Sequence, residues 1–371
     1  MEKEKISAFQ LFCIMMCFEV GTTVLFGLGA DAKQDGWLSI LLSMLSGLIL
    51  MWVYIKLSNL YPYDTLTQMI PKIVGKIIGI PLVVIYISYF IYSAARACRD
   101  FSNLIKGTIL TETPVIIIIG SFLILLIYCL RGGIEVFGRM GELIFPIYML
   151  ALILTWILMF GSQLIHLKQL TPVLAGGIRP VLNSAFPLIV TFPFGEQILI
   201  MMLLPALNNK KKIKKVGMLV ILIGGILLTL NTIINLSILG PNLFGDVNYP
   251  LFTAARMVSI ADFIQNIDAV IILMMIAGVF FKMGVWMYAA AAGTSQLFGL
   301  TNHHSILIPL GTLITSLSIV IASNAPEHLE IGFKYFAPYF LIPLEIVIPI
   351  LLLVIACIRK KLSSRTHQVT G

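Results

Sequence analysis

Ten long apolar runs constrain the fold of this chain of 371 residues more than any other feature. A helix needs about 20 mostly apolar residues to cross roughly 30 Å of hydrocarbon. The clearest runs are Gly36–Ile55, Thr113–Leu130 and Ser305–Asn324, which contain no charged residue. Because the chain is 59% hydrophobic and only 11% charged, it lacks the polar surface that a soluble domain needs. We therefore expect an all-α polytopic membrane protein with ten transmembrane helices.

The expected spans form a single integral membrane domain over residues 1–371, with no domain-sized soluble insertion. If the chain consists of two five-helix halves, the first repeat covers about residues 6–160 and the second about 180–358. A short tail follows at 359–371. The centres of the ten spans are expected near Gly21, Leu45, Ile87, Leu123, Ile153, Thr191, Leu227, Phe280, Leu313 and Pro349.

Basic residues gather in alternate connections, and this pattern predicts the orientation in the membrane. The richest clusters are the loop 210–215 and the tail after Cys357, and cytoplasmic loops carry the excess of Lys and Arg in membrane proteins. Both termini are therefore expected in the cytoplasm. The formal net charge of +8 needs no nucleic-acid partner, because the basic residues lie between apolar runs and not along one soluble face.

Two spans contain helix-breaking residues at membrane depth. The first, Phe18–Gly29, holds Glu19 and three glycines, and the sixth, Asn183–Glu196, holds two prolines, a glycine and a glutamate. Proline removes an amide donor, and glycine lowers the cost of leaving helical geometry. Broken backbone is tolerated in a membrane only inside protein or beside a water-filled cavity, so a polar cavity is expected there. The alternative is a pair of kinked packing helices.

Four charged residues lie within the apolar runs: Glu19, Glu196, Lys282 and Glu345. Each costs at least about 2.5–3.5 kcal/mol at the bilayer centre, so each needs a partner, a cavity or a proton. Glu196 is either a protonated acid satisfied within the break or an ionised acid that faces a ligand ammonium. Lys282 either forms a structural ion pair with one of the three glutamates or acts as a fixed cation in the place of a coupled sodium ion.

The third span carries tyrosines at helical spacing, followed by charged residues near its outer end. Tyr92 either reaches a cavity or, like Tyr86 and Tyr89, packs or anchors the helix at the headgroups. Arg99 and Asp100 are expected to form an interfacial ion pair. Another apolar stretch, 251–261, has helical spacing and is expected to lie on the membrane or to cap an outer cavity.

Nothing in the sequence indicates an enzyme, a cofactor or a metal site. The five histidines are expected in loops or in the tail, and no Walker, zincin, nucleophile-elbow or dinucleotide motif occurs. The five cysteines are odd in number and lack the spacing of metal ligands, so they imply neither a metal site nor a disulfide framework.

Several of these features together resemble the spore germination permeases, the B subunits of endospore germinant receptors. The resemblance rests on the ten spans, the run Glu19-Val20-Gly21-Thr22-Thr23, the run Phe192-Pro193-Phe194-Gly195-Glu196 and the basic loop between the sixth and seventh spans. It implies membership of the amino acid–polyamine–organocation superfamily and a LeuT-like fold of two inverted five-helix repeats with helices 1 and 6 broken.

The resemblance also implies a ligand site and partners. A small germinant, typically an amino acid, would bind in the spore inner membrane, and the protein would act with an A subunit and a lipoprotein C subunit. The residues that match the binding segments are Gly21, Thr22, Thr23, Val24, Thr191, Phe192, Phe194, Gly195 and Glu196. The leading hypothesis is therefore a receptor. The alternatives are a proton-coupled amino acid transporter that uses Glu19 or Glu196, and a membrane scaffold without a ligand.

Overall fold

The computed structural model describes residues 5–258, 268–300 and 302–369, and these are almost entirely helical. The first half contains α1 (Ala8–Val20), η1 (Thr23–Leu25), η2 (Ala30–Asp35), α2 (Gly36–Leu60), α3 (Leu66–Val74), α4 (Lys76–Thr108), α5 (Val115–Arg131), α6 (Gly133–Gly161) and η3 (Leu167–Leu170). The second half contains α7 (Ile178–Ser184), η4 (Ala185–Phe194), η5 (Gly195–Leu199), α8 (Ile200–Leu203), η6 (Leu204–Ala206), η7 (Lys210–Lys212), α9 (Ile213–Asp246), α10 (Pro250–Arg256), α11 (Asp268–Phe298), η8 (His303–Ile306), α12 (Leu307–Val320), α13 (Ala325–Glu330), η9 (Ile331–Val347) and α14 (Ile348–Val369).

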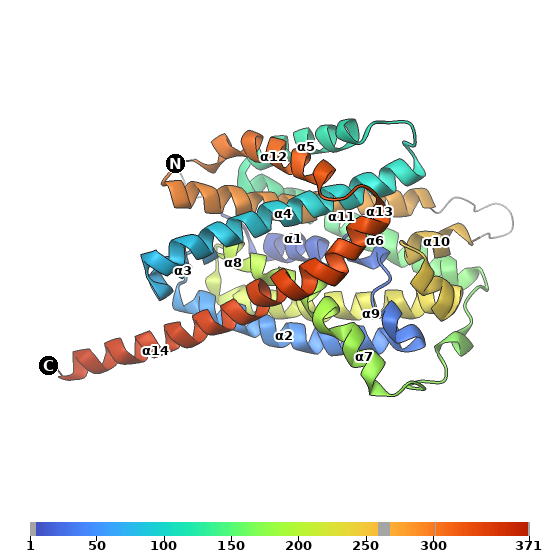
Figure 1. The fold of residues 1–371 in the computed structure, drawn as a ribbon, viewed down its shortest axis with the longest axis horizontal. Coiled ribbons are helices and arrows are strands. Elements are labelled where there is room, and N and C mark those ends of the chain that lie inside the picture. The colour runs from blue at the N-terminus through green and yellow to red at the C-terminus, as the bar shows by residue number, and fades with distance from the viewer. Residues whose placement is uncertain (1–4, 259–267, 301, 370–371) are drawn as a thin grey trace.

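Within the described residues, nine helical segments are long and apolar enough to cross a membrane, and the 17-residue helix Val115–Arg131 adds a shorter one. The ten passes expected from the sequence are thus present. The long helices run roughly parallel, and the two chain termini lie at the same end of the bundle (Figure 1). We call this end, which also contains α3, the terminal end. The opposite end contains α7, α10 and α13, and we call it the far end.

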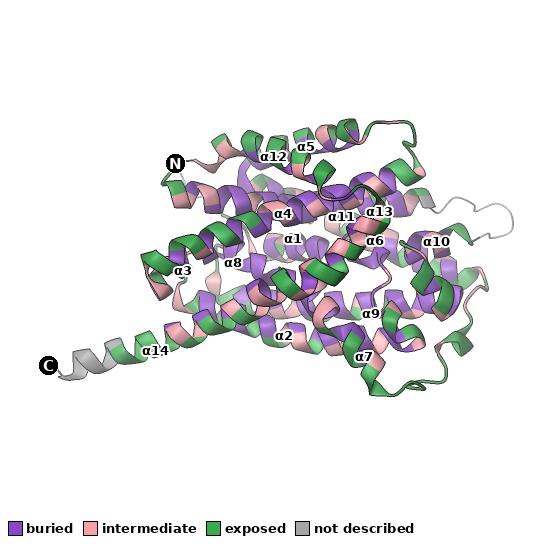
Figure 2. Cartoon of the chain, in the orientation of Figure 1, coloured by how far each residue is buried: buried purple, intermediate pink, exposed green. Residues whose placement is uncertain are grey.

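The two interrupted spans lie in the interior of the bundle. Most of the first span and most of the sixth are buried, whereas the fifth and ninth spans are largely exposed on the outside (Figure 2). Helix α1 packs against α6, α9 and α11, and α2 packs along α9. A helix that is apolar on all sides and surrounded by others belongs in the core of a bundle. Any internal cavity therefore lies where the broken spans meet their neighbours.

Both breaks occur within the runs where the sequence predicts them. The first helix ends at Val20, and a turn at Gly21 and Thr22 leads into the short 3-10 helix η1. In the sixth span the backbone leaves helical geometry at Phe186 and Phe192, and a 3-10 turn, η5, follows before α8. Proline cannot donate to the helical ladder, which accounts for the loss of regular helix around Pro187 and Pro193.

Two glycines allow the first break to lie directly against the backbone of the eighth span. A β-carbon on Gly21 would collide with the backbone of Gly278 in α11, and one on Gly278 would collide with Gly21. Small residues allow helix backbones to approach this closely inside membranes, where packing drives helix association. The contact fixes the position of the first break relative to α11, which carries Lys282.

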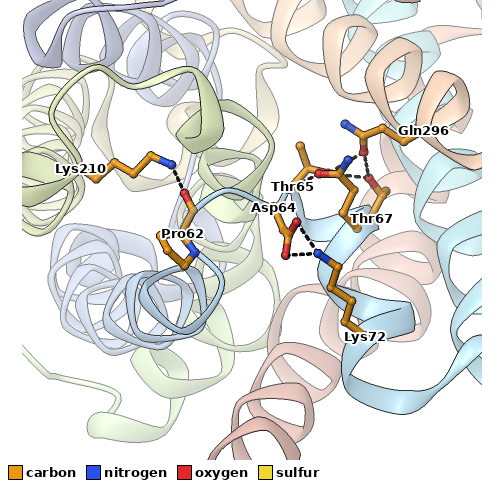
Figure 3. Close-up of polar contacts among 8 residues, drawn as sticks. Pro62, Asp64, Thr65, Thr67, Lys72, Lys210 and Gln296 are labelled. Atoms are coloured by element: carbon orange, nitrogen blue, oxygen red, sulfur yellow. Dashed lines mark hydrogen bonds and ion pairs between the residues drawn. The ribbon is translucent and has the colours of Figure 1, made fainter. Parts of the chain in front are cut away.

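Polar contacts connect the helices at the terminal end of the bundle (Figure 3). The hydroxyls of Thr65 and Thr67, at the start of α3, donate to Gln296 Oε1 of α11 at 2.6 and 2.7 Å. Lys72 Nζ contacts both oxygens of Asp64 at 2.7 Å, and Lys210 donates to the Pro62 carbonyl. These contacts hold the loop between α2 and α3 against the end of α11 and against η7.

The connection expected to contain an amphipathic helix forms α10, which covers Pro250–Arg256. Leu251, Ala254 and Ala255 on this helix are buried, and α10 contacts α9, α11 and η1 at the far end. The helix therefore packs on the bundle above the first break. The last residues of the expected stretch, 259–261, lie outside the described residues.

We expect the substitution Gly278→Ala to lower the thermal stability of the purified protein, because the added methyl group meets the backbone of Gly21. Overpacking of this kind typically costs about 1–3 kcal/mol. The matched control is Gly120→Ala in α5, where an added β-carbon meets nothing within 4 Å. Equal melting temperatures for the two variants in the same detergent would contradict the close contact.

Candidate functional site

A small cavity lies at the meeting point of the first, third, sixth, eighth and tenth spans. Its volume is about 60 Å³, which is room for a few water molecules, since one water needs roughly 10–15 Å³. The lining residues are Thr22, Phe26, Ser93, Arg96, Ala97, Asp100, Leu188, Phe192, Glu196, Lys282, Leu329, Gly332, Phe333, Phe336, Ala337 and Leu341. Charged groups and aromatic rings therefore face one another in the middle of an apolar bundle.

The cavity contains a buried ion pair between the sixth and eighth spans. Lys282 Nζ lies 2.7 Å from Glu196 Oε2, and both side chains are almost fully buried. The ammonium also lies 4.1 Å from the ring centroid of Phe192 and 5.4 Å from that of Phe18, which adds cation–π attraction. Of the three partners that the sequence left open for Lys282, the structure selects Glu196. Removing one member of a buried pair leaves an uncompensated charge, so the two residues depend on each other.

A second polar contact lies at the far end of the cavity. His328 Nε2 in α13 lies 2.9 Å from Asp100 Oδ1 in α4, and Arg96 Nη2 donates to the His328 carbonyl at 3.1 Å. Two expectations from the sequence are wrong here. Asp100 pairs with His328 and not with Arg99, because adjacent residues on a helix do not face each other. Asp100 lies one helical turn after Arg96, and both face the tenth span. His328 lies in a short helix with its side chain buried, not in a loop.

Aromatic rings form much of the remaining wall. The Phe26 ring packs against Phe192 at 5.9 Å and against Tyr249 at 5.8 Å, measured between ring centroids. Burial raises the pKa of the Tyr249 hydroxyl, so this group stays neutral. Phe336 of η9 separates the cavity from an outward-facing groove of about 650 Å³, and it lines both.

Two other buried glutamates lie outside this cavity. The Tyr89 hydroxyl donates to Glu345 Oε1, and the Tyr54 hydroxyl contacts the carbonyls of Gly195 and Glu345 at 3.1 and 2.6 Å. Glu19 accepts a hydrogen bond from Gln197 Nε2. These contacts join the sixth span to the first, second, third and tenth spans on the terminal side of the breaks.

Some of the site residues predicted from the sequence line the cavity, and the others lie in the helices around it. Thr22, Phe192, Glu196 and Lys282 line the cavity, whereas Gly21, Thr23, Val24, Thr191, Phe194, Gly195, Glu19 and Glu345 do not. Tyr92 lines the outward-facing groove, and its ring lies 4.7 Å from that of Phe336. Phe194 is fully buried, and Gly47 of α2 leaves room for its ring.

Neighbouring side chains and the helix itself satisfy part of the backbone at the first break. The Gly21 amide donates to the Cys17 carbonyl at 2.9 Å, so it is not available to a ligand. Tyr148 of α6 donates its hydroxyl to the Gly21 carbonyl at 3.0 Å, and Asn231 of α9 donates to the Val24 carbonyl at 2.8 Å. Broken backbone at membrane depth requires such internal partners.

The sequence analysis missed most of the third-span and tenth-span residues of the cavity, notably Ser93, Arg96, Asp100 and Phe336. A signal was present, because positions 93, 96 and 100 recur at three and four residues and so share one face of a helix. No comparable signal marks Phe336. Among the residues that the structure describes, no group of three or more His, Cys, Asp and Glu side chains is placed to hold a metal ion.

A protein-family model described as "Spore germination protein" matches residues 5–326 of this chain. The chain is 35% identical over 361 residues to spore germination protein KB of Bacillus subtilis (strain 168), with 97% of each chain covered. It is 28% identical over 336 residues to spore germination protein YndE of the same organism, with 89% of each covered.

A solved structure, MhsT in complex with L-phenylalanine, matches the fold with a TM-score of 0.60 at 14% identity. The match covers 96% of this chain and 99% of that one, so the expected LeuT-like fold is confirmed. The expected family is confirmed as well, because the family model and the relatives cover nearly the whole sequence. The chain belongs to the spore germination protein family.

Proposed function

We propose that this protein is the membrane subunit of a spore germinant receptor, and that a small germinant, typically an amino acid, binds between the first and sixth spans. The observation that supports this most strongly is the cavity itself. It lies where two broken helices meet, it contains the Glu196–Lys282 ion pair, and it belongs to a chain of the germination protein family. In this proposal the protein binds a ligand and signals, and it does not catalyse a reaction.

The size of the cavity implies how binding would be sensed. At about 60 Å³ it is too small for an amino acid, so in this proposal the structure corresponds to a closed state. The Asp100–His328 contact joins two helices beside the cavity, and the contacts around Gln296 join α3 to α11 at the terminal end. A germinant would stabilise a more open state by making contacts that the closed state lacks, and this difference in affinity would shift the equilibrium.

The proposal extends to partners and location. The receptor would act with an A subunit and a lipoprotein C subunit in the spore inner membrane, with both termini in the cytoplasm. The common position of the termini at one end of the bundle and the basic residues of the loop 210–215 support this orientation. The second candidate is a proton-coupled amino acid transporter, which the LeuT-like fold favours.

The first test measures dipicolinate release from spores that lack this chain, challenged separately with amino acids, sugars and nucleosides. We expect loss of the response to one ligand class and recovery when the chain is re-expressed. Unaltered germination toward every ligand, in spores without other receptors of this family, would contradict the receptor role.

Glu196→Gln is expected to abolish the germinant response while the protein remains in the membrane. Because this change also leaves Lys282 as an uncompensated buried cation, it can cost about 3–5 kcal/mol of stability. The double variant Glu196→Gln with Lys282→Met removes both charges and is expected to recover most of that stability. A double variant that is stable and still responds normally would remove Glu196 from the site.

Receptor and transporter are distinguished by uptake into sealed vesicles that contain the purified protein. We expect saturable binding of the labelled germinant identified in the spore assay, without accumulation when the inside is made alkaline. Accumulation that follows the pH gradient, and that is lost when the gradient is collapsed, would establish transport.

A further inference from the structure

One cation beside the cavity has a buried hydrogen-bond donor without an acceptor. Glu196 is paired with Lys282 at 2.7 Å, and Asp100 is paired with His328 at 2.9 Å. Arg96, which lines the same cavity, has no ion-pair partner among the described residues. Its Nη1 atom is buried and has no hydrogen-bond partner. A buried N–H group without an acceptor is destabilising, and more so when the group is charged.

The Arg96 guanidinium is nevertheless held in a fixed position. Its Nη2 atom donates to the His328 carbonyl at 3.1 Å, and its central carbon lies 5.7 Å from the ring centroid of Phe336. A β-carbon at position 332 would collide with Nη2, so Gly332 leaves the space that the guanidinium occupies. One side of the guanidinium is therefore anchored to the tenth span, while the other side is left without an acceptor.

Ser93, one helical turn before Arg96, adds a second donor in the same cavity. Its hydroxyl oxygen is buried and has no hydrogen-bond partner. A fixed guanidinium beside a free hydroxyl suits a carboxylate, because the planar N–H groups of arginine match the two carboxylate oxygens. Glu196 lines the same cavity; Lys282 contacts only its Oε2 atom, so in a more open state its other oxygen could accept from an ammonium group. Together these groups suit a solute that carries both charges.

We propose that Arg96, with Ser93, binds the carboxylate of the germinant, and that the germinant is a small amino acid whose ammonium group faces Glu196. This inference rests on the proposed function and refines it. Of the first-span residues expected to bind the ligand, Gly21 does not offer its amide, because that amide already donates to the Cys17 carbonyl. In this proposal the specificity for a carboxylate comes from the third span.

The test measures thermal stabilisation of the purified full-length chain by matched sets of compounds. Each set contains an amino acid, its carboxamide and the corresponding amine: alanine, alaninamide and ethylamine, then phenylalanine, phenylalaninamide and phenethylamine, with glucose as an uncharged solute. A ligand that binds only the folded state raises its melting temperature. We expect one acid to stabilise the chain, and its carboxamide to bind about 10- to 100-fold more weakly, since hydrogen bonds to charged groups are worth about 1.5–3 kcal/mol.

Variants of Arg96 distinguish a residue that binds the ligand carboxylate from one that only holds the tenth span in place. Arg96→Met should remove the preference for the acid over its carboxamide, and Arg96→Lys should keep part of it. Arg99→Met, in the same helix but outside the cavity, should leave the preference unchanged. A merely structural Arg96 would lower stability in Arg96→Met without changing the ratio of the two affinities.

The outcomes distinguish failure of this inference from failure of the proposed function. If wild-type protein binds the carboxamide or the amine as tightly as the acid, or binds glucose alone, the carboxylate site is wrong and the receptor role stands. An unchanged acid preference in Arg96→Met or Arg96→Lys also overturns the inference. If no compound stabilises the chain and spores that lack it germinate normally, the proposed function itself fails.

Discussion

Hydrocarbon offers no hydrogen bonds, and this constraint determines how the rest of the bundle is arranged. Two helices are broken at membrane depth, so the freed carbonyls and the buried charges must find partners inside the protein. Tyr148 and Asn231 supply donors to the first break, and Tyr54 supplies one to the sixth. The helices that carry these donors must surround the broken spans, which explains why the first and sixth spans occupy the interior.

The same constraint explains where chemistry can occur. A charge in the interior is costly unless it is paired, and Glu196 and Lys282 satisfy each other on facing spans. The three buried glutamates have separate surroundings: Glu196 faces the cavity, while Glu19 and Glu345 are held by Gln197 and Tyr89. Glu196 lines the cavity, whereas the other two join the helices around it.

The sequence predicts the spans, the two breaks and the family, because apolar length, glycine and proline act locally and leave a pattern in the chain. It also identifies Glu196 and Lys282, since charges inside apolar runs are conspicuous. It does not predict that Asp100 meets His328, because that contact joins helices far apart in the sequence. Phe336 is not predicted for a similar reason, because the sequence does not indicate whether an aromatic residue in a membrane span faces the lipid or the interior of the bundle.

The tenth span reaches from the cavity at the far end to the terminal end of the bundle. Residues Ala325–Leu362 form one helical element of 38 residues, roughly 57 Å long at about 1.5 Å per residue. Its far end lines the cavity, Tyr86 and Tyr54 hold its middle through the carbonyls of Leu344 and Glu345, and Arg359 contacts the Lys72 carbonyl at the terminal end. One continuous helical element therefore connects the wall of the cavity with the terminal end of the bundle, so the positions of its two ends are coupled through the same backbone.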